Sequence, residues 1–207
     1  MSIHNIAVRW AAALAKELGS DQREQNRMAY GLELLLGEIV KWIVLLSLAE
    51  IMGLWREVII ITVSASMLRL VSGGEHCNEY YRCMIGGTIW FLLLGWIVRY
   101  VNMSITVESL LVIAGISFAA AFVLLALYAP GDTENKPINT DAERTKFKRL
   151  SLILAVVYLI IMIGTTQTKA AQWICLPVAV GMLAQVFTVT PLGYRFLHWV
   201  DRVLAFD

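Results

Sequence analysis

The stretch SITVESLLVIAGISFAAAFVLLALYA, residues 104–129, contains one charged residue, Glu108, and no proline. A helix needs roughly 20 predominantly apolar residues to cross the hydrocarbon core of a bilayer, and this stretch exceeds that length. It therefore predicts a transmembrane helix and makes a membrane the expected environment of the chain.

Five more apolar stretches appear when the 207-residue chain is divided at its charged and turn-forming residues. They are residues 30–52, 57–71, 83–99, 150–167 and 171–191. With 58% hydrophobic and 16% charged residues, the chain is more apolar than a soluble domain. We expect an all-α, polytopic protein of about six transmembrane or partly re-entrant helices, forming a single integral membrane domain over residues 1–207. The stretch 57–71 is short and 171–191 contains Pro177 and Gly181, so these two could be kinked or re-entrant.

The first 29 residues lack the uninterrupted apolar core of a cleaved signal peptide, and we expect no removable targeting segment there. Ile6, Trp10, Leu14 and Leu18 recur at helical spacing within them. This pattern predicts an N-terminal amphipathic helix lying at the membrane interface. An ordinary solvated cap helix is the alternative.

The distribution of basic residues predicts how the chain is oriented in the membrane. With six crossings, thirteen Lys and Arg residues fall on one side and three on the other. The larger group is Arg9, Lys16, Arg23, Arg27, Arg69, Arg82, Lys136, Arg144, Lys146, Lys148, Arg149, Arg195 and Arg202; the smaller is Arg56, Arg99 and Lys169. Because short cytoplasmic loops collect basic residues, both termini, the loop 130–149 and residues 72–82 are expected in the cytoplasm.

Several functional classes find no support in the sequence. The net charge is +1, and no dense basic run is interleaved with aromatic residues, so no nucleic-acid partner is expected. The His-Glu-x-x-His pattern of zinc proteases and the Gly-x-Ser-x-Gly elbow of serine hydrolases are both missing. The three cysteines, Cys77, Cys83 and Cys175, fit reduced thiols better than disulfide staples.

The segment between the second and third apolar stretches, residues 69–83, is the densest collection of reactive groups in the chain. His76 and Cys83 within it could act as base and nucleophile, because a thiol attacks a carbonyl as its thiolate. Seven residues of continuous helix would separate them by about 10.5 Å along the axis, too far for a hydrogen bond. A dyad therefore requires that the intervening chain bend or unwind, and Gly73-Gly74 supplies conformational freedom just upstream.

Other interpretations of the same segment remain open. His76 could be an interfacial boundary residue and Cys83 a small apolar filler. Cys77 is a rival nucleophile, although adjacent residues point in different directions. A metal site built from His76, Cys77 and Cys83 matches no standard zinc spacing and lacks an evident fourth ligand, so neither a metal nor a cofactor is expected. Cys175, inside an apolar stretch, is expected to pack.

The first apolar stretch contains Glu33, Glu38 and Lys41, which are costly in hydrocarbon unless they are paired or face a polar cavity. Glu38 and Lys41 are three residues apart and can form an ion pair on one helix face. The alternative is a polar lining for a substrate path. On that interpretation the protein would be a small peptide transporter or exporter, and a noncatalytic membrane scaffold is a third reading.

Three groups of residues occur in a characteristic order between residues 30 and 150. They are Tyr30-Gly31-Leu32-Glu33 with Lys41; the block Arg69, Gly74, His76 and Cys83; and Tyr128-Ala129-Pro130 with Lys136-Pro137-Ile138. In their order and hydrophobic setting, these groups resemble the accessory gene regulator B (AgrB) family, membrane endopeptidases of bacterial quorum sensing. The block has the spacing of the family's Arg…Gly-x-His…Cys pattern.

The resemblance implies that Cys83 is the nucleophile and His76 its general base, while Arg69, Gly74 and the Glu33 and Lys41 positions shape the site or bind substrate. It implies cleavage of an AgrD-like precursor peptide through a thioester on Cys83. A thiol of the bound peptide then attacks this thioester and closes a thiolactone ring. It also implies a homodimer in the bacterial cell membrane. Glycines at 86, 87 and 95 would permit close helix packing, within or between subunits.

Overall fold

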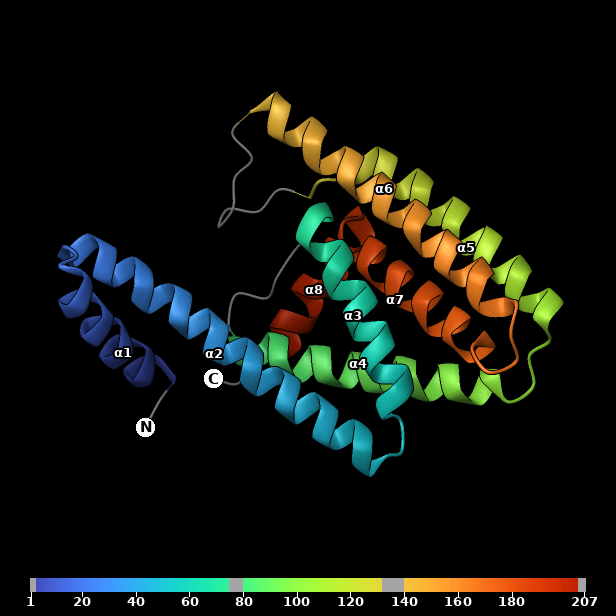
Figure 1. The fold of residues 1–207 in the computed structure, drawn as a ribbon, viewed down its shortest axis with the longest axis horizontal. Coiled ribbons are helices and arrows are strands. Elements are labelled where there is room, and N and C mark those ends of the chain that lie inside the picture. Colours follow the sequence, from blue (N-terminus) through green and yellow to red (C-terminus); the bar gives the residue numbers. More distant parts are fainter. Residues whose placement is uncertain (1–2, 75–79, 132–139, 205–207) are drawn as a thin grey trace. The chain divides into compact units, whose positions relative to one another are not determined.

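The computed structural model describes residues 3–74, 80–131 and 140–204, and these residues are almost entirely helical (Figure 1). The helices are α1 (Ile3–Leu18), α2 (Gln22–Ile51), α3 (Trp55–Ser72), α4 (Tyr80–Asn102), α5 (Val107–Tyr128), α6 (Asp141–Thr166), the short 3₁₀ helix η1 (Gln172–Ile174), α7 (Cys175–Thr188) and α8 (Pro191–Val203). They belong to two compact units, residues 1–48 and 49–207. The prediction of one integral membrane domain concerns how these units sit together, and it stays a prediction.

The first unit is a hairpin of two helices, α1 and the larger part of α2. The predicted amphipathic segment, residues 1–29, is divided between them, because α1 ends at Leu18. Gly19 adopts a left-handed conformation (φ +64°) after α1, and the Asp21 carboxylate accepts a hydrogen bond from the backbone N–H of Glu24 at 2.7 Å, which starts α2. Three alanines spaced four residues apart on α1 are buried: Ala7, Ala11 and Ala15. The predicted apolar stripe of α1 stays largely exposed at Trp10, Leu14 and Leu18.

The first five predicted apolar stretches each correspond to one helix, from α2 to α6. The sixth, residues 171–191, contains η1 and α7 and reaches the first residue of α8. Among the described residues, α4, α5 and α6 are long and apolar enough to cross a membrane, and α7 with α8 adds a fourth if that bent pair is one span. Helices α2 and α3 are too highly charged to be counted as membrane-spanning. The charged residues are Arg56, Glu57 and Arg69 in α3, and Glu38, Lys41 and Glu50 in the apolar half of α2. The all-α membrane architecture is confirmed, whereas six complete crossings stay a prediction.

Helix α7 is the centre of the second unit and packs against α3, α5 and α6 (Figure 1). The core between these helices is formed by Ile61, Leu68, Leu110, Leu125, Met162, Met182 and Val186. A buried hydrogen bond adds to this packing, because the Tyr158 hydroxyl on α6 donates to the Ser64 carbonyl on α3 at 2.7 Å. The second unit is therefore a bundle of helices packed around α7.

Glycines set the closest helix approaches in this bundle. A Cβ at Gly181 of α7 would lie 2.5 Å from the Ile61 carbonyl oxygen of α3, and one at Gly95 of α4 would lie 2.6 Å from the Val58 side chain. Gly86 similarly faces α8, whereas nothing lies within 4 Å of a Cβ at Gly87. Two of the three glycines singled out for close packing therefore serve contacts inside the unit, and the homodimer stays a prediction.

The predicted irregularity in residues 171–191 lies elsewhere than at Pro177 and Gly181. Pro177 sits in the first turn of α7, where its missing N–H has no helical partner to lose. The sharp change of direction comes between α7 and α8, whose axes differ by 83°. Thr190 caps α8 there by accepting the Gly193 N–H at 3.1 Å, and Pro191 occupies the first turn.

Candidate functional site

Helix α3 ends just before the segment that contains His76, and glycines make it end there. Gly73 (φ +65°) and Gly74 (φ +124°) both lie in the left-handed half of backbone space, which other residues rarely enter. The Gly73 N–H still donates to the Arg69 carbonyl at 3.0 Å, closing the last turn. The helix is therefore interrupted within residues 69–83. A His76/Cys83 dyad requires such an interruption.

A buried glutamine from α7 holds this helix end. The side chain of Gln185 is 3% exposed, and its Nε2 donates to the Gly73 carbonyl at 2.8 Å and to the Ser72 hydroxyl at 3.1 Å. Its Oε1 accepts a long hydrogen bond from Arg69 Nη1 at 3.5 Å, and Arg69 Nη2 reaches the Gly74 carbonyl at 3.4 Å. Carbonyls at the C-terminal end of a helix have no partner within it, and here Gln185 and Arg69 supply partners for those of Gly73 and Gly74, the two residues that follow α3.

The extended residues after α5 complete the same junction. The N–H of Gly131 donates to the Ser72 carbonyl at 2.8 Å, and Gly131 forms an isolated β-bridge with Gly73. A Cβ at Gly73 would lie 2.3 Å from the Gly131 carbonyl oxygen, so this approach requires glycine at position 73. A Cβ at Gly131 would be tight, 3.0 Å from the Gly74 nitrogen. The junction therefore joins the Arg69–Gly74 block to the Tyr128-Ala129-Pro130 signature, two motifs far apart in the sequence.

Gly74 is restricted by space as well as by backbone conformation. A Cβ there would lie 2.7 Å from the Thr188 hydroxyl of α7 and 3.4 Å from the Gln185 amide nitrogen. The predicted site-shaping residues Arg69 and Gly74 are thus brought together with Gln185, Thr188 and Gly131. We refer to Arg69, Ser72, Gly73, Gly74, Gly131 and Gln185 as the glycine junction.

Cys83 lies in the first turn of α4, half-buried. Its neighbours in sequence pack on α8: Arg82 Nη1 lies 3.4 Å from the Asp201 carboxylate, and Gly86 faces Val200. The role of Cys83 as nucleophile stays a prediction.

The predicted base, His76, and the rival nucleophile, Cys77, lie outside the described residues, in the interval 75–79 between the glycine junction and α4. Their distances to Cys83 are therefore part of the prediction. In the described ranges, no group of three His, Cys, Asp or Glu side chains is placed to hold a metal ion. The alternative metal site at His76, Cys77 and Cys83 is not tested by this finding.

Of the remaining predicted residues, Glu33, Glu38 and Lys41 lie in the first unit and are paired there, whereas Cys175 lies in the second unit. Lys41 Nζ donates to the Glu38 carboxylate at 2.6 Å, which confirms the predicted ion pair. Glu33 Oε2 lies 2.9 Å from His4 Nδ1 of α1, a partner that the sequence analysis missed. Cys175 is fully buried in α7, which confirms that it packs.

Two residues of the junction, Gln185 and Gly131, were also missed from the sequence. Gln185 had a detectable signal, because an uncharged polar residue in a long apolar stretch must find a hydrogen-bond partner inside the bundle. Gly131 had a weaker one, since a glycine after Pro130 is typical of any turn. Neither signal names the partner, because both contacts link segments distant in sequence.

The chain is similar to known proteins along most of its length. Residues 7–189 match the family model described as accessory gene regulator B. The AgrB-like protein 2 of Clostridium perfringens is 28% identical over 206 residues, covering 96% of both chains, and the AgrB-like protein of Listeria innocua is 27% identical over 86% of this chain and 82% of its own. No solved structure matches the chain. With its membrane-type helices and a family match over nearly its whole length, this chain belongs to the accessory gene regulator B family.

Proposed function

We propose that the protein is a membrane cysteine endopeptidase that matures a quorum-sensing precursor peptide, with Cys83 as nucleophile and His76 as general base. Family membership supports a role in peptide processing for the accessory gene regulator system. The observation that carries the specific chemistry is the helix break. The glycine junction ends α3 at Ser72, four residues before His76, and Cys83 is the fourth residue of α4 as described from Tyr80.

The reaction proceeds by acyl transfer. His76 takes the proton of the Cys83 thiol, and the thiolate attacks the carbonyl carbon of the scissile peptide bond. His76 then returns that proton to the leaving amine, so the C-terminal part of the precursor departs and its N-terminal part remains as a thioester on Cys83. A cysteine thiol of the bound peptide attacks the thioester, which closes a thiolactone and restores Cys83.

Ring closure competes with hydrolysis of the thioester by water. A peptide thiol held beside the thioester has a large effective concentration, and a site at the membrane edge limits access of water. The substrate is an AgrD-like peptide, which meets the enzyme at the membrane surface. We place the site on the cytoplasmic side because thirteen of the basic residues fall on that side of a six-span arrangement.

The alternative transporter function receives no support from the charges that motivated it. Glu38 pairs with Lys41, and Glu33 pairs with His4, within the first unit. Charges that neutralise one another locally have a structural explanation and require no substrate path.

The test is precursor cleavage by the full-length protein reconstituted in lipid vesicles. Cys83→Ala and His76→Ala should each abolish cleavage, whereas the matched control Cys77→Ala should retain it, with equal amounts of protein in the membrane. Cleavage by the Cys83 variant would refute the proposal, as would its loss in the Cys77 variant alone. A product lighter by one water than the linear fragment establishes cyclisation.

A further inference from the structure

Helix α8 has a defined position at the end of the bundle. It leaves α7 at 83°, and the turn is tight because a Cβ at Gly193 would lie 1.9 Å from the Phe187 carbonyl oxygen. Its inner face packs through Phe196, whose ring lies 5.7 Å from the rings of both Trp90 and Phe187. Because α7 runs within the bundle beside α5 and α6, α8 runs across the end of that bundle (Figure 1).

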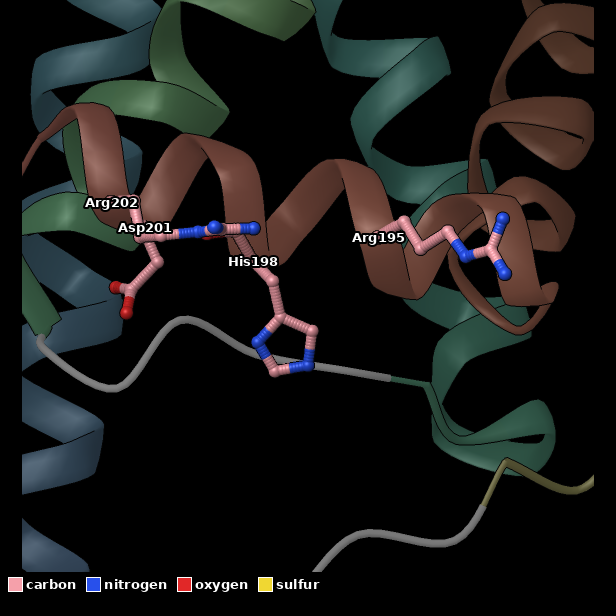
Figure 2. Close-up of a pocket in the computed structure, with 4 residues that line it drawn as sticks. All are labelled: Arg195, His198, Asp201 and Arg202. Atoms are coloured by element: carbon pink, nitrogen blue, oxygen red, sulfur yellow. The ribbon is translucent and has the colours of Figure 1, made fainter.

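The outer side of α8 carries a row of basic groups. Arg195, His198 and Arg202 line an open hollow of about 460 Å³ together with Asp201 (Figure 2). Asp201 is the one acidic residue among the four described residues that line the hollow, and Arg82 of α4 pairs with its carboxylate. Within the described part of the chain, no carboxylate forms an ion pair with Arg195 or Arg202. The hollow therefore presents positive charge to an external anion.

An exposed apolar row lies beside the basic one. Leu192, Trp199 and Val203 are 67%, 56% and 55% exposed. At 100° per residue, this row lies about a quarter-turn around the helix from the row of Arg195, His198 and Arg202. The apolar row borders the inner face, since the Trp199 ring lies 6.1 Å from the Phe196 ring, whereas the basic row lies away from that face. Helix α8 thus combines a packed face, an exposed apolar flank and a basic outer row.

We propose that α8 lies along the membrane surface and binds the phosphate groups of anionic lipids through Arg195 and Arg202. Its apolar flank would enter the acyl boundary while the guanidinium groups remain at headgroup level, the arrangement of an interfacial amphipathic helix. Arginine binds phosphate oxygens with its planar pair of donors. The apolar flank favours a lipid over an acidic peptide, because a soluble peptide would leave Leu192, Trp199 and Val203 in water.

The experiment measures lipid retention by the purified full-length protein with native mass spectrometry. Micelles are supplied with phosphatidylglycerol or phosphatidylcholine of identical acyl chains. We expect the wild type to retain phosphatidylglycerol at least threefold more than phosphatidylcholine, and R195Q/R202Q to lose this preference. The matched control K146Q/R149Q, which removes two basic residues from the hollow beside α6, should keep it. The variant R195K/R202K should keep most of it.

Three results would overturn the proposal. The preference could survive in R195Q/R202Q, or disappear equally in K146Q/R149Q. Inorganic phosphate or an acidic peptide could also displace phosphatidylglycerol at concentrations where it does not displace phosphatidylcholine, which would identify a soluble ligand. Equal melting temperatures of all variants in phosphatidylcholine show that the substitutions leave the fold intact. The lipid measurement does not involve precursor cleavage, so it stands or falls separately from the proposed activity.

Discussion

Replacing Gln185 by leucine tests whether the glycine junction supports the active site. The substitution keeps a side chain of similar size in α7 but removes two donated hydrogen bonds, to the Gly73 carbonyl at 2.8 Å and to the Ser72 hydroxyl at 3.1 Å. It also removes the long hydrogen bond accepted from Arg69 Nη1 at 3.5 Å, whose contribution is small at that length. A buried hydrogen bond contributes about 1 kcal/mol net, so the loss is about 2 kcal/mol. That energy corresponds to about a thirtyfold rise in the fraction of molecules whose junction is open.

The assay combines cleavage kinetics with thermal unfolding in micelles. We expect the kcat for precursor cleavage to fall in Q185L, by a factor that approaches about thirty as the open junction becomes the major form. KM should change little, because Gln185 positions the end of α3 rather than binding peptide. The melting temperature should fall by roughly 4–8 °C, from the loss of about 2 kcal/mol in a chain of this size.

The control for Q185L is Q167L, the same substitution at an exposed glutamine whose amide donates to the Ile163 carbonyl of its own helix. It should match the wild type in both measurements. Wild-type kcat in Q185L would refute the positioning role, even if its stability fell. An equal loss of kcat in Q167L would show that the effect is not specific to the junction.

Two further substitutions test the junction and the bundle separately. G74A should abolish cleavage, because its Cβ would lie 2.7 Å from the Thr188 hydroxyl. The backbone conformation at this position (φ +124°) is also one that alanine rarely adopts. The control G87A, whose Cβ would have no atom within 4 Å, should retain wild-type cleavage. Comparable cleavage by the two alanine variants would contradict the spatial argument. Y158F should lower the free energy of unfolding by about 1 kcal/mol through loss of the hydrogen bond to Ser64, seen as a drop of roughly 2–4 °C in melting temperature. An unchanged melting temperature would show that this bond adds no net stability.

Local patterns predicted the helices well because helix formation in a membrane depends mainly on composition over short windows. A long apolar run satisfies its backbone polar groups internally wherever it sits, so residues 104–129 predict α5 without knowledge of any partner. The ion pair of Glu38 and Lys41 was predictable for a similar reason, since residues three apart share a helix face. Gly73-Gly74 was recognised as a point of freedom, and α3 ends there.

The location of the bend in residues 171–191 was less predictable. Pro177 and Gly181 are helix-breaking residues in general, yet Pro177 occupies a first turn and Gly181 allows α7 to approach α3 closely. The bend lies instead at Thr190 and Pro191, where Gly193 fits against the Phe187 carbonyl. Whether a glycine serves packing or bending depends on what lies opposite, which local sequence does not contain.

The sequence by itself determined that this is an all-α membrane protein with an ordered Arg, Gly, His and Cys block, because apolar runs and motif spacing are properties of the chain alone. Only the tertiary structure decided that Gln185 and Gly131 close the end of α3, and that α8 turns away with a basic row outward. These features rest on contacts between residues up to 116 positions apart in the sequence. Such contacts form only once packing has brought the helix ends together.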